Sequence, residues 1–326
     1  DGTGWQGKLV NDGMTRAEEN HFEQNIQFLL MGDNQLAKKW RLGYTAGANI
    51  MYLKFEQLSA SVQNMLEKDN WIFNTGNKLT SALDDGHSRA MYSAFASAQL
   101  AYDEWLSLDI TARNDWSSTL PKKNNSFFYP SASLSWVFSD FMRSIDHKLP
   151  SWITFAKLRV SAAQVGKDPA PYNLYNVRKY QFEMGNRKPI NNTIKLNANL
   201  KPEIKTSYEV GVDMKFLDNR LGFDFTYYYN TTKNQAMLVD ASSPWTQQWV
   251  NAGKINNTGV EFMLYGTPVK TRDFQFDITA NLAHNSSTVK ELADGVNRVY
   301  FAGDSNMPVK VGAVKGGKLG DIFANN

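Results

Sequence analysis

The sequence predicts an all-β fold, an antiparallel up-and-down transmembrane β-barrel of which about ten strands are present. Three observations support this prediction: long segments alternate between apolar and polar residues, aromatic residues gather near the segment ends, and short connections alternate with long ones. Each is a property of barrels that cross the outer membrane with strands.

The segment 105–115 shows the alternation most clearly. Leu106, Leu108 and Ile110 fall on one parity, whereas Asp109 and Arg113 fall on the other. Because successive side chains of a strand point to opposite faces, one face is apolar and the other is polar and charged. The same pattern predicts ten strands, at 21–31, 39–53, 91–102, 105–115, 127–139, 154–165, 206–216, 221–231, 259–267 and 272–284.

The length of these segments and their aromatic residues separate a membrane barrel from a soluble sandwich, which also alternates. Most segments run nine to thirteen residues, whereas soluble strands average about 5–6 and a tilted membrane strand needs about 9–11. Aromatic residues make up 13% of the chain; Tyr102 and Trp105 flank one turn, and Phe127, Phe128 and Tyr129 open another strand. This placement is typical of the aromatic girdles at the lipid–water boundaries.

The connections between the segments differ in length at the two ends of the sheet. Short turns are expected at 102–105, 217–220 and 267–272, and long loops at 54–90, 116–126, 166–205 and 232–258, with 140–153 fitting least well. An outer-membrane barrel has short periplasmic turns and long extracellular loops. The long loops are therefore expected outside the cell.

Composition excludes several other classes of protein. A net charge of +3 without a stripe of Lys and Arg argues against nucleic-acid binding. With no cysteine there is no disulfide scaffold and no thiolate metal site. The histidines His21, His87, His147 and His284 are widely spaced, and nucleophile-elbow and P-loop motifs are absent, so we expect no metal, no cofactor and no enzymatic activity.

Several stretches together resemble the SusC/RagA family of TonB-dependent outer-membrane transporters, in the same order along the chain. The matching stretches are Leu106 to Asp115 with Ser117 and Ser118, Phe128 to Trp136, Leu158 to Ser161 with Gly166, Leu200 to Glu203 with Thr206, Tyr208 to Gly211, Phe225 to Tyr228, Asn251 to Ile255 with Asn257, Gly259 to Glu261, Gly266 to Pro268, and Val311 to Phe323. These matches cover roughly 90–325, and a looser match covers 20–55.

The resemblance implies a 22-stranded barrel closed by an N-terminal plug in the outer membrane of a Gram-negative, Bacteroidetes-like cell. Such proteins import glycans or peptides with energy relayed by TonB, and a SusD-type surface lipoprotein covers the barrel as a lid. Residues 1–326 would then form part of a single barrel domain. Because neither the plug nor the C-terminal strands are recognised, we expect an internal part of a longer protein. A passive porin and a barrel enzyme such as a protease or lipase remain alternatives.

Two sets of residues are candidates for function. Loop aromatics can stack on sugars or pack against peptide side chains, although they can equally build small loop cores or the interface with the lid; they are Trp71, Phe73, Tyr172, Tyr175, Tyr180, Trp245 and Trp249. Charged residues on the polar parity are expected to face the lumen, either along a substrate path or as the ordinary wall of a wide barrel; they are Asp109, Arg113, Glu209, Asp213, Lys215, Asp224, Asp273 and Asp277.

Overall fold

A computed structural model describes residues 13–65, 72, 76–175, 179–183, 186–190, 193–300 and 309–324. Within these ranges the chain is almost entirely β-structure, and ten strands form one antiparallel sheet. All ten expected strands are present in it. In sheet order they are β1 Gly13–Ala37, β2 Trp40–Met65, β3 Gly76–Tyr102, β4 Leu106–Ser117, β5 Ser126–Val137, β6 Ile153–Lys167, β10 Glu203–Phe216, β11 Leu221–Lys233, β14 Lys254–Lys270 and β15 Gln275–Glu291.

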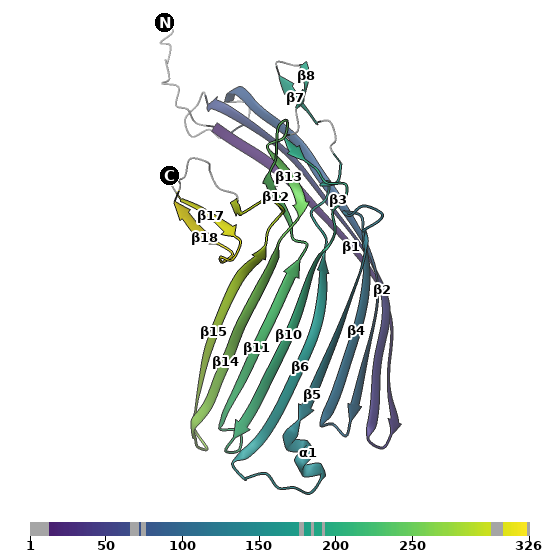
Figure 1. Ribbon diagram of the computed structural model, residues 1–326, viewed down its shortest axis with the longest axis vertical. Helices are drawn as coiled ribbons and strands as arrows, with labels where there is room; N and C mark the ends of the chain where they lie inside the picture. The colour runs from purple at the N-terminus through teal and green to yellow at the C-terminus, as the bar shows by residue number, and fades with distance from the viewer. Residues whose placement is uncertain are drawn as a thin grey trace. The chain divides into compact units, whose positions relative to one another are not determined.

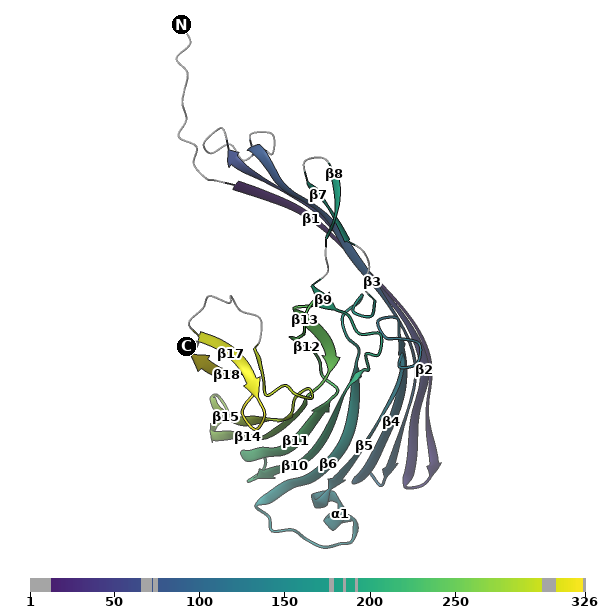
Figure 2. The ribbon, with the colours of Figure 1, turned by 45° about the horizontal axis from the view of Figure 1, so that its top comes forward.

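The chain divides into two compact units, one of 1–26 with 50–91 and one of 27–49 with 92–326. In the larger unit, Figures 1 and 2 show the strands from β4 to β15 side by side in a single curved layer. Among the described residues, no helix has the length and apolar character needed to cross a membrane.

Backbone pairing aligns side chains of one kind across seven strands of the larger unit. Residues directly opposite each other in an antiparallel pair project from the same face. One row consists entirely of apolar residues: Leu106, Trp136, Leu158, Val212, Phe225, Phe262 and Leu282. A neighbouring row on the opposite face is mostly polar or small: Ser107, Ser135, Arg159, Gly211, Thr226, Glu261 and Ala283. The parity expected from the sequence therefore holds from strand to strand.

The expectation of a loop over 54–90 was wrong, because β2 runs on to Met65 and β3 begins at Gly76. The first three strands have 25, 26 and 27 residues, about twice the length of the 12-residue β4 and β5. In the smaller unit these strands are joined by polar pairs such as Thr15–Ser61, 2.8 Å apart, and Gln57–Glu19, 2.9 Å apart. A strand paired in water need not separate apolar from polar faces, so alternation does not reveal it.

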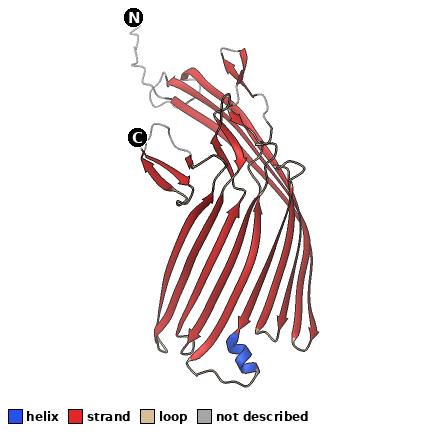
Figure 3. Ribbon diagram, in the orientation of Figure 1, coloured by secondary structure: helices blue, strands red, loops and turns tan. Residues whose placement is uncertain are grey.

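A short helix, α1 Phe138–Ser144, lies where the sequence predicted the end of a strand and an untidy connection. Phe141 in this helix packs against Trp105 and Trp136, with ring centroids 4.8 and 5.7 Å apart. Figure 3 shows α1, in blue, at the end of the sheet that carries the short turns. Those turns comprise residues 103–105, 217–220 and 271–274.

The long connections contain structure of their own. They include the hairpin β7 Lys179–Glu183 with β8 Asn186–Ile190, and a sheet of β9 Ile194–Lys195, β12 Ala236–Asp240 and β13 Gln247–Asn251. After β15, a third small sheet contains β16 Arg298–Tyr300, β17 Val309–Val314 and β18 Asp321–Ala324. The glycine-containing run 312–320 begins within β17 and forms the turn before β18.

We predict that the two faces of β4 differ sharply in their tolerance of charge. Leu108→Arg should destabilise the barrel by up to about 2–4 kcal/mol if this position lies near the bilayer midplane, because an arginine would replace an apolar contact with lipid. Asp109→Asn, on the polar face, should cost far less. Refolding titrations of both variants in lipid bilayers measure the difference, and a larger cost for Asp109→Asn would show that the faces are assigned the wrong way round.

Candidate functional site

The polar face of the large sheet gathers seven of the eight charged residues expected to face the lumen. The pairing registers place Asp109, Arg113, Glu209, Asp213, Lys215 and Asp224 on this face. Asp277 in β15 also lies on it and accepts a hydrogen bond of 2.6 Å from the hydroxyl of Thr267. Asp273 lies in the turn before β15, since this strand begins at Gln275 rather than at 272.

An ion pair spans three strands at the centre of this face. Arg159 of β6 donates two hydrogen bonds to the carboxylate of Asp224 in β11, of 2.7 and 2.6 Å, and a third of 2.6 Å to Thr226. Its side chain must cross β10 to reach them, and it does so over Gly211. A Cβ atom at Gly211 would lie 2.4 Å from Arg159 Nε, so any larger residue there would displace the Arg159 side chain from this position.

This ion pair also reduces a repulsion between carboxylates. Asp213 and Asp224 are directly opposite each other in β10 and β11, and like charges at such positions destabilise a sheet. The bidentate guanidinium of Arg159 neutralises one of the two. Sequence reasoning had identified Asp213 and Asp224 but missed Arg159 and Gly211, because the strand pairing that joins them cannot be deduced from spacing.

A second polar cluster lies toward the end of the sheet that carries the long loops. Arg113 donates to Asp115 and to Ser93, both at 2.8 Å, and its guanidinium lies 5.5 Å from the ring centroid of Phe95. The buried Asp115 also accepts a hydrogen bond of 2.5 Å from the hydroxyl of Tyr129. Because the charges of this cluster are paired with each other, it forms a rigid part of the wall.

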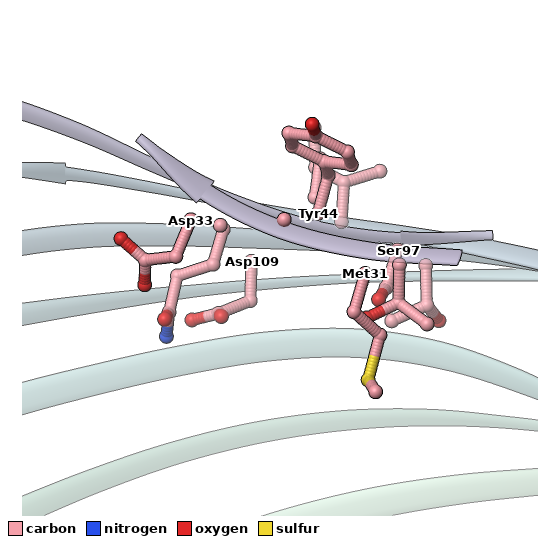
Figure 4. A pocket seen from close by; sticks show the side chains of 12 residues that line it. Met31, Asp33, Tyr44, Ser97 and Asp109 are labelled. Atoms are coloured by element: carbon pink, nitrogen blue, oxygen red, sulfur yellow. The ribbon is translucent and has the colours of Figure 1, made fainter. Parts of the chain in front are cut away.

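A shallow hollow of about 480 Å³ lies against β1 to β4 within the larger unit. Met31, Asp33 and Asp109 point to one side of the strands, and Tyr44 points to the other (Figure 4). Arg41 holds the carboxylate of Asp33 through hydrogen bonds of 2.8 and 2.9 Å. Asp109 therefore lies on a hydrophilic surface that several strands share.

The loops that follow β4, β6 and β11 share a small core. Leu120, Phe127 and Leu200 are buried together, with Tyr129, Leu174 and Trp249 packed around them. Next to this core, the buried carboxylate of Asp168 accepts hydrogen bonds from Ser117, at 2.5 Å, and from Thr119, at 2.8 Å. These contacts join loops that are far apart in the sequence into one body.

The aromatic candidates are found in different environments. Trp249 belongs to the loop core and Trp245 is half-buried, whereas Tyr172 and Tyr175 are 60% and 64% exposed. Tyr180 lies in β7 but its side chain is outside the described set, as are the residues Trp71 and Phe73. Within the described ranges, no group of three or more His, Asp or Glu residues is arranged to hold a metal ion.

Comparison with known proteins identifies relatives of this sheet. Residues 4–310 match the family model described as TonB dependent receptor-like, beta-barrel. Over 209 residues the chain is 28% identical to the TonB-dependent receptor SusC of Bacteroides thetaiotaomicron, covering 60% of this chain and 20% of that protein. It is 26% identical over 215 residues to the TonB-dependent receptor P3 of Formosa agariphila, covering 63% and 21%.

The solved structure of the RagAB peptide importer in its closed-closed state superposes with a TM-score of 0.78 at 19% identity. The match covers 93% of this chain and 33% of that one, so the chain spans a fifth to a third of the length of the relatives it matches. These relatives are receptors and importers, which agrees with the expectation that the protein is not an enzyme.

We predict that Gly211 is required for the ion pair on the polar face. Gly211→Ala should lower the free energy of unfolding by about 1–3 kcal/mol, because the new methyl group displaces the Arg159 side chain. The matched control is Gly266→Ala in β14, where a Cβ would make ordinary contacts of 3.6 and 3.7 Å.

A double-mutant cycle with Arg159→Ala separates this effect from general loss of strand flexibility. Once the arginine side chain is removed, Gly211→Ala should cost much less, giving a clear coupling energy. Equal costs for the Gly211 and Gly266 variants, measured by urea unfolding in lipid vesicles, would contradict the prediction.

Proposed function

Because this chain belongs to the TonB-dependent receptor-like β-barrel family and forms part of an outer-membrane barrel, we propose that the complete protein is an energised nutrient importer. Its substrate would be an oligosaccharide or oligopeptide too large for simple diffusion. We further propose that residues 1–326 form part of one barrel domain, that a SusD-type lipoprotein covers it as a lid, and that TonB supplies the energy.

The observation that carries this proposal is the separation of the sheet into two faces. The row from Leu106 to Leu282 is apolar throughout, whereas the opposite face carries charged residues, of which Arg159 with Asp224 and Arg113 with Asp115 form ion pairs. Unpaired charges and open backbone are tolerated at membrane depth only around water-filled or protein-filled space. We therefore propose that Asp109, Arg113, Glu209, Asp213, Lys215, Asp224 and Asp277 line the lumen.

The connected loops support the capture step of this proposal. Their shared core of Leu120, Phe127 and Leu200 holds neighbouring residues in place, and a preorganised surface loses less entropy when it binds a ligand or a partner. Within that surface, the exposed Tyr172 and Tyr175 are proposed as contacts for substrate or lid. Trp249 is proposed as a structural residue, because it packs into the loop core.

An importer must also release what it captures, and this requires an external source of energy. A ligand shifts an equilibrium only by its difference in affinity for two states. Tight capture at the loops therefore cannot by itself deliver substrate to the periplasm. Pulling on a plug through TonB would supply the missing free energy.

Deleting TonB distinguishes the importer from a passive porin. Growth on the substrate should be lost, while binding of substrate to the surface of intact cells should be largely retained. Both are measured in the same strain, with growth on a diffusible monosaccharide as the control. Continued TonB-independent uptake would favour a porin and would falsify the proposal.

We predict that the long connections lie outside the cell. An epitope inserted between the exposed residues Ser242 and Ser243, which join β12 to β13, should be labelled by antibody on intact cells. The same epitope between Asp218 and Asn219, in the short turn before β11, should be labelled after the outer membrane is permeabilised. The reverse labelling pattern would require the opposite topology.

A further inference from the structure

The small sheet of β16, β17 and β18 is attached to the end of β15 at the side of the long loops, as Figure 1 shows for β17 and β18. Backbone hydrogen bonds join them: Val289 donates to the carbonyl of Gly317 at 2.9 Å, and Gly316 donates to the carbonyl of Val289 at 2.8 Å. Leu319 donates a further bond of 3.3 Å to the hydroxyl of Ser287. These contacts hold the small sheet in a defined place.

One face of this small sheet is buried against the large one. Val299 and Ala313 are paired in register and are 9% and 2% exposed. Together with Ile255 and Val289, they line an apolar cavity of about 260 Å³. The residues of opposite parity include Arg298, Tyr300, Gly312, Lys310, Phe323 and Asp321. Of these, Tyr300 also borders the rim of the cavity.

These residues form a surface that we call the cationic–aromatic platform, defined by Arg298, Tyr300, Lys310 and Phe323. The Arg298 guanidinium lies 4.4 Å from the ring centroid of Phe323 and donates a hydrogen bond of 2.9 Å to the Tyr300 hydroxyl. The Lys310 ammonium lies 5.1 Å from the Tyr300 ring centroid. Tyr300, opposite Gly312 in the pairing, remains 43% exposed.

The platform carries an excess of positive charge. The described residues of the small sheet and its turn include four cations, Arg298, Lys310, Lys315 and Lys318, and one acid, Asp321. The Asp321 carboxylate accepts a backbone hydrogen bond from Lys318 at 2.9 Å. Among the described residues, the partners of Arg298 and Lys310 are aromatic rings and the Tyr300 hydroxyl, and no carboxylate lies within ion-pair distance of either.

We propose that the platform binds an acidic oligosaccharide, a glycan that carries carboxylate or sulfate groups. A guanidinium stacked on an aromatic ring is held in orientation while its N–H groups remain able to bind a planar anion in bidentate fashion. The exposed Tyr300 ring offers a flat surface for the apolar face of a sugar. An exposed strand surface without a deep pocket suits an extended chain of sugar residues better than a buried side chain.

This inference rests on the proposed import function, because a capture site at the loop end of an importer would concentrate its substrate there. It is tested on purified, full-length protein in detergent, without TonB. The probes are tetragalacturonate, a heparin-derived tetrasaccharide, neutral galactotetraose and hexaglutamate peptide, with affinity measured by calorimetry. If the acidic glycans do not bind, the proposal of TonB-dependent import is unaffected. If import proves not to depend on TonB, the binding measured here is unaffected.

The acidic tetrasaccharides, or one of them, should bind, and galactotetraose should bind at least tenfold more weakly. Arg298→Gln and Lys310→Gln should each weaken binding roughly tenfold, since each removes charge-assisted hydrogen bonds. Tyr300→Ala should have a similar effect through lost stacking. The matched control is Lys315→Gln, which removes the same charge from the exposed turn beside the platform and should change affinity less than twofold.

Four results would overturn the proposal. They are no binding of either acidic tetrasaccharide, equal binding of galactotetraose, equal or tighter binding of hexaglutamate, and a loss with Lys315→Gln as large as that with Arg298→Gln. The third would identify a site for acidic peptides, and the fourth a diffuse charge effect. Circular dichroism and thermal melting of each variant exclude misfolding as the cause of lost binding.

Discussion

Backbone hydrogen bonding is the constraint on which this structure depends. In hydrocarbon an unpaired N–H or C=O group is so costly that strands must pair along their whole length. Continuous pairing then fixes the register, and a register error of one residue would turn every side chain to the opposite face. The seven-residue apolar row from Leu106 to Leu282 exists because the register shifts of these strands, at 215–216, 254–255 and 266–269, lie away from it.

The same constraint shapes the polar face. Side chains on this face find partners two residues along the same strand, as Arg113 does with Asp115, or across strands, as Arg159 does by passing over Gly211 to Asp224. Each such pair removes a charge that would otherwise be left without compensation in a partly buried wall. In the second cluster, Asp115 likewise compensates the charge of Arg113 and accepts a hydrogen bond from Tyr129. The wall thus combines ion pairs with charged residues such as Asp213, whose Oδ1 atom has no hydrogen-bond partner among the described residues.

In the loops and the small sheets, burial of apolar side chains is an additional source of stability. The loops pack around Leu120, Phe127 and Leu200, as in a small soluble domain, and the sheet of β16 to β18 buries Val299 and Ala313 while exposing Arg298 and Tyr300. In the smaller unit, the extended strands are joined by polar pairs and by ring contacts such as His21 with Phe55, at 4.9 Å.

The sequence by itself determined the ten barrel strands and which side chains share a face, because alternation between apolar and polar residues is local in the chain. It did not determine how far β2 and β3 extend, because residues 54–65 and 76–90 do not alternate strictly between apolar and polar. It also could not show that Trp249 packs into a loop core or that Arg298 meets Phe323. Tertiary structure decided these contacts, because they join residues that no local periodicity connects.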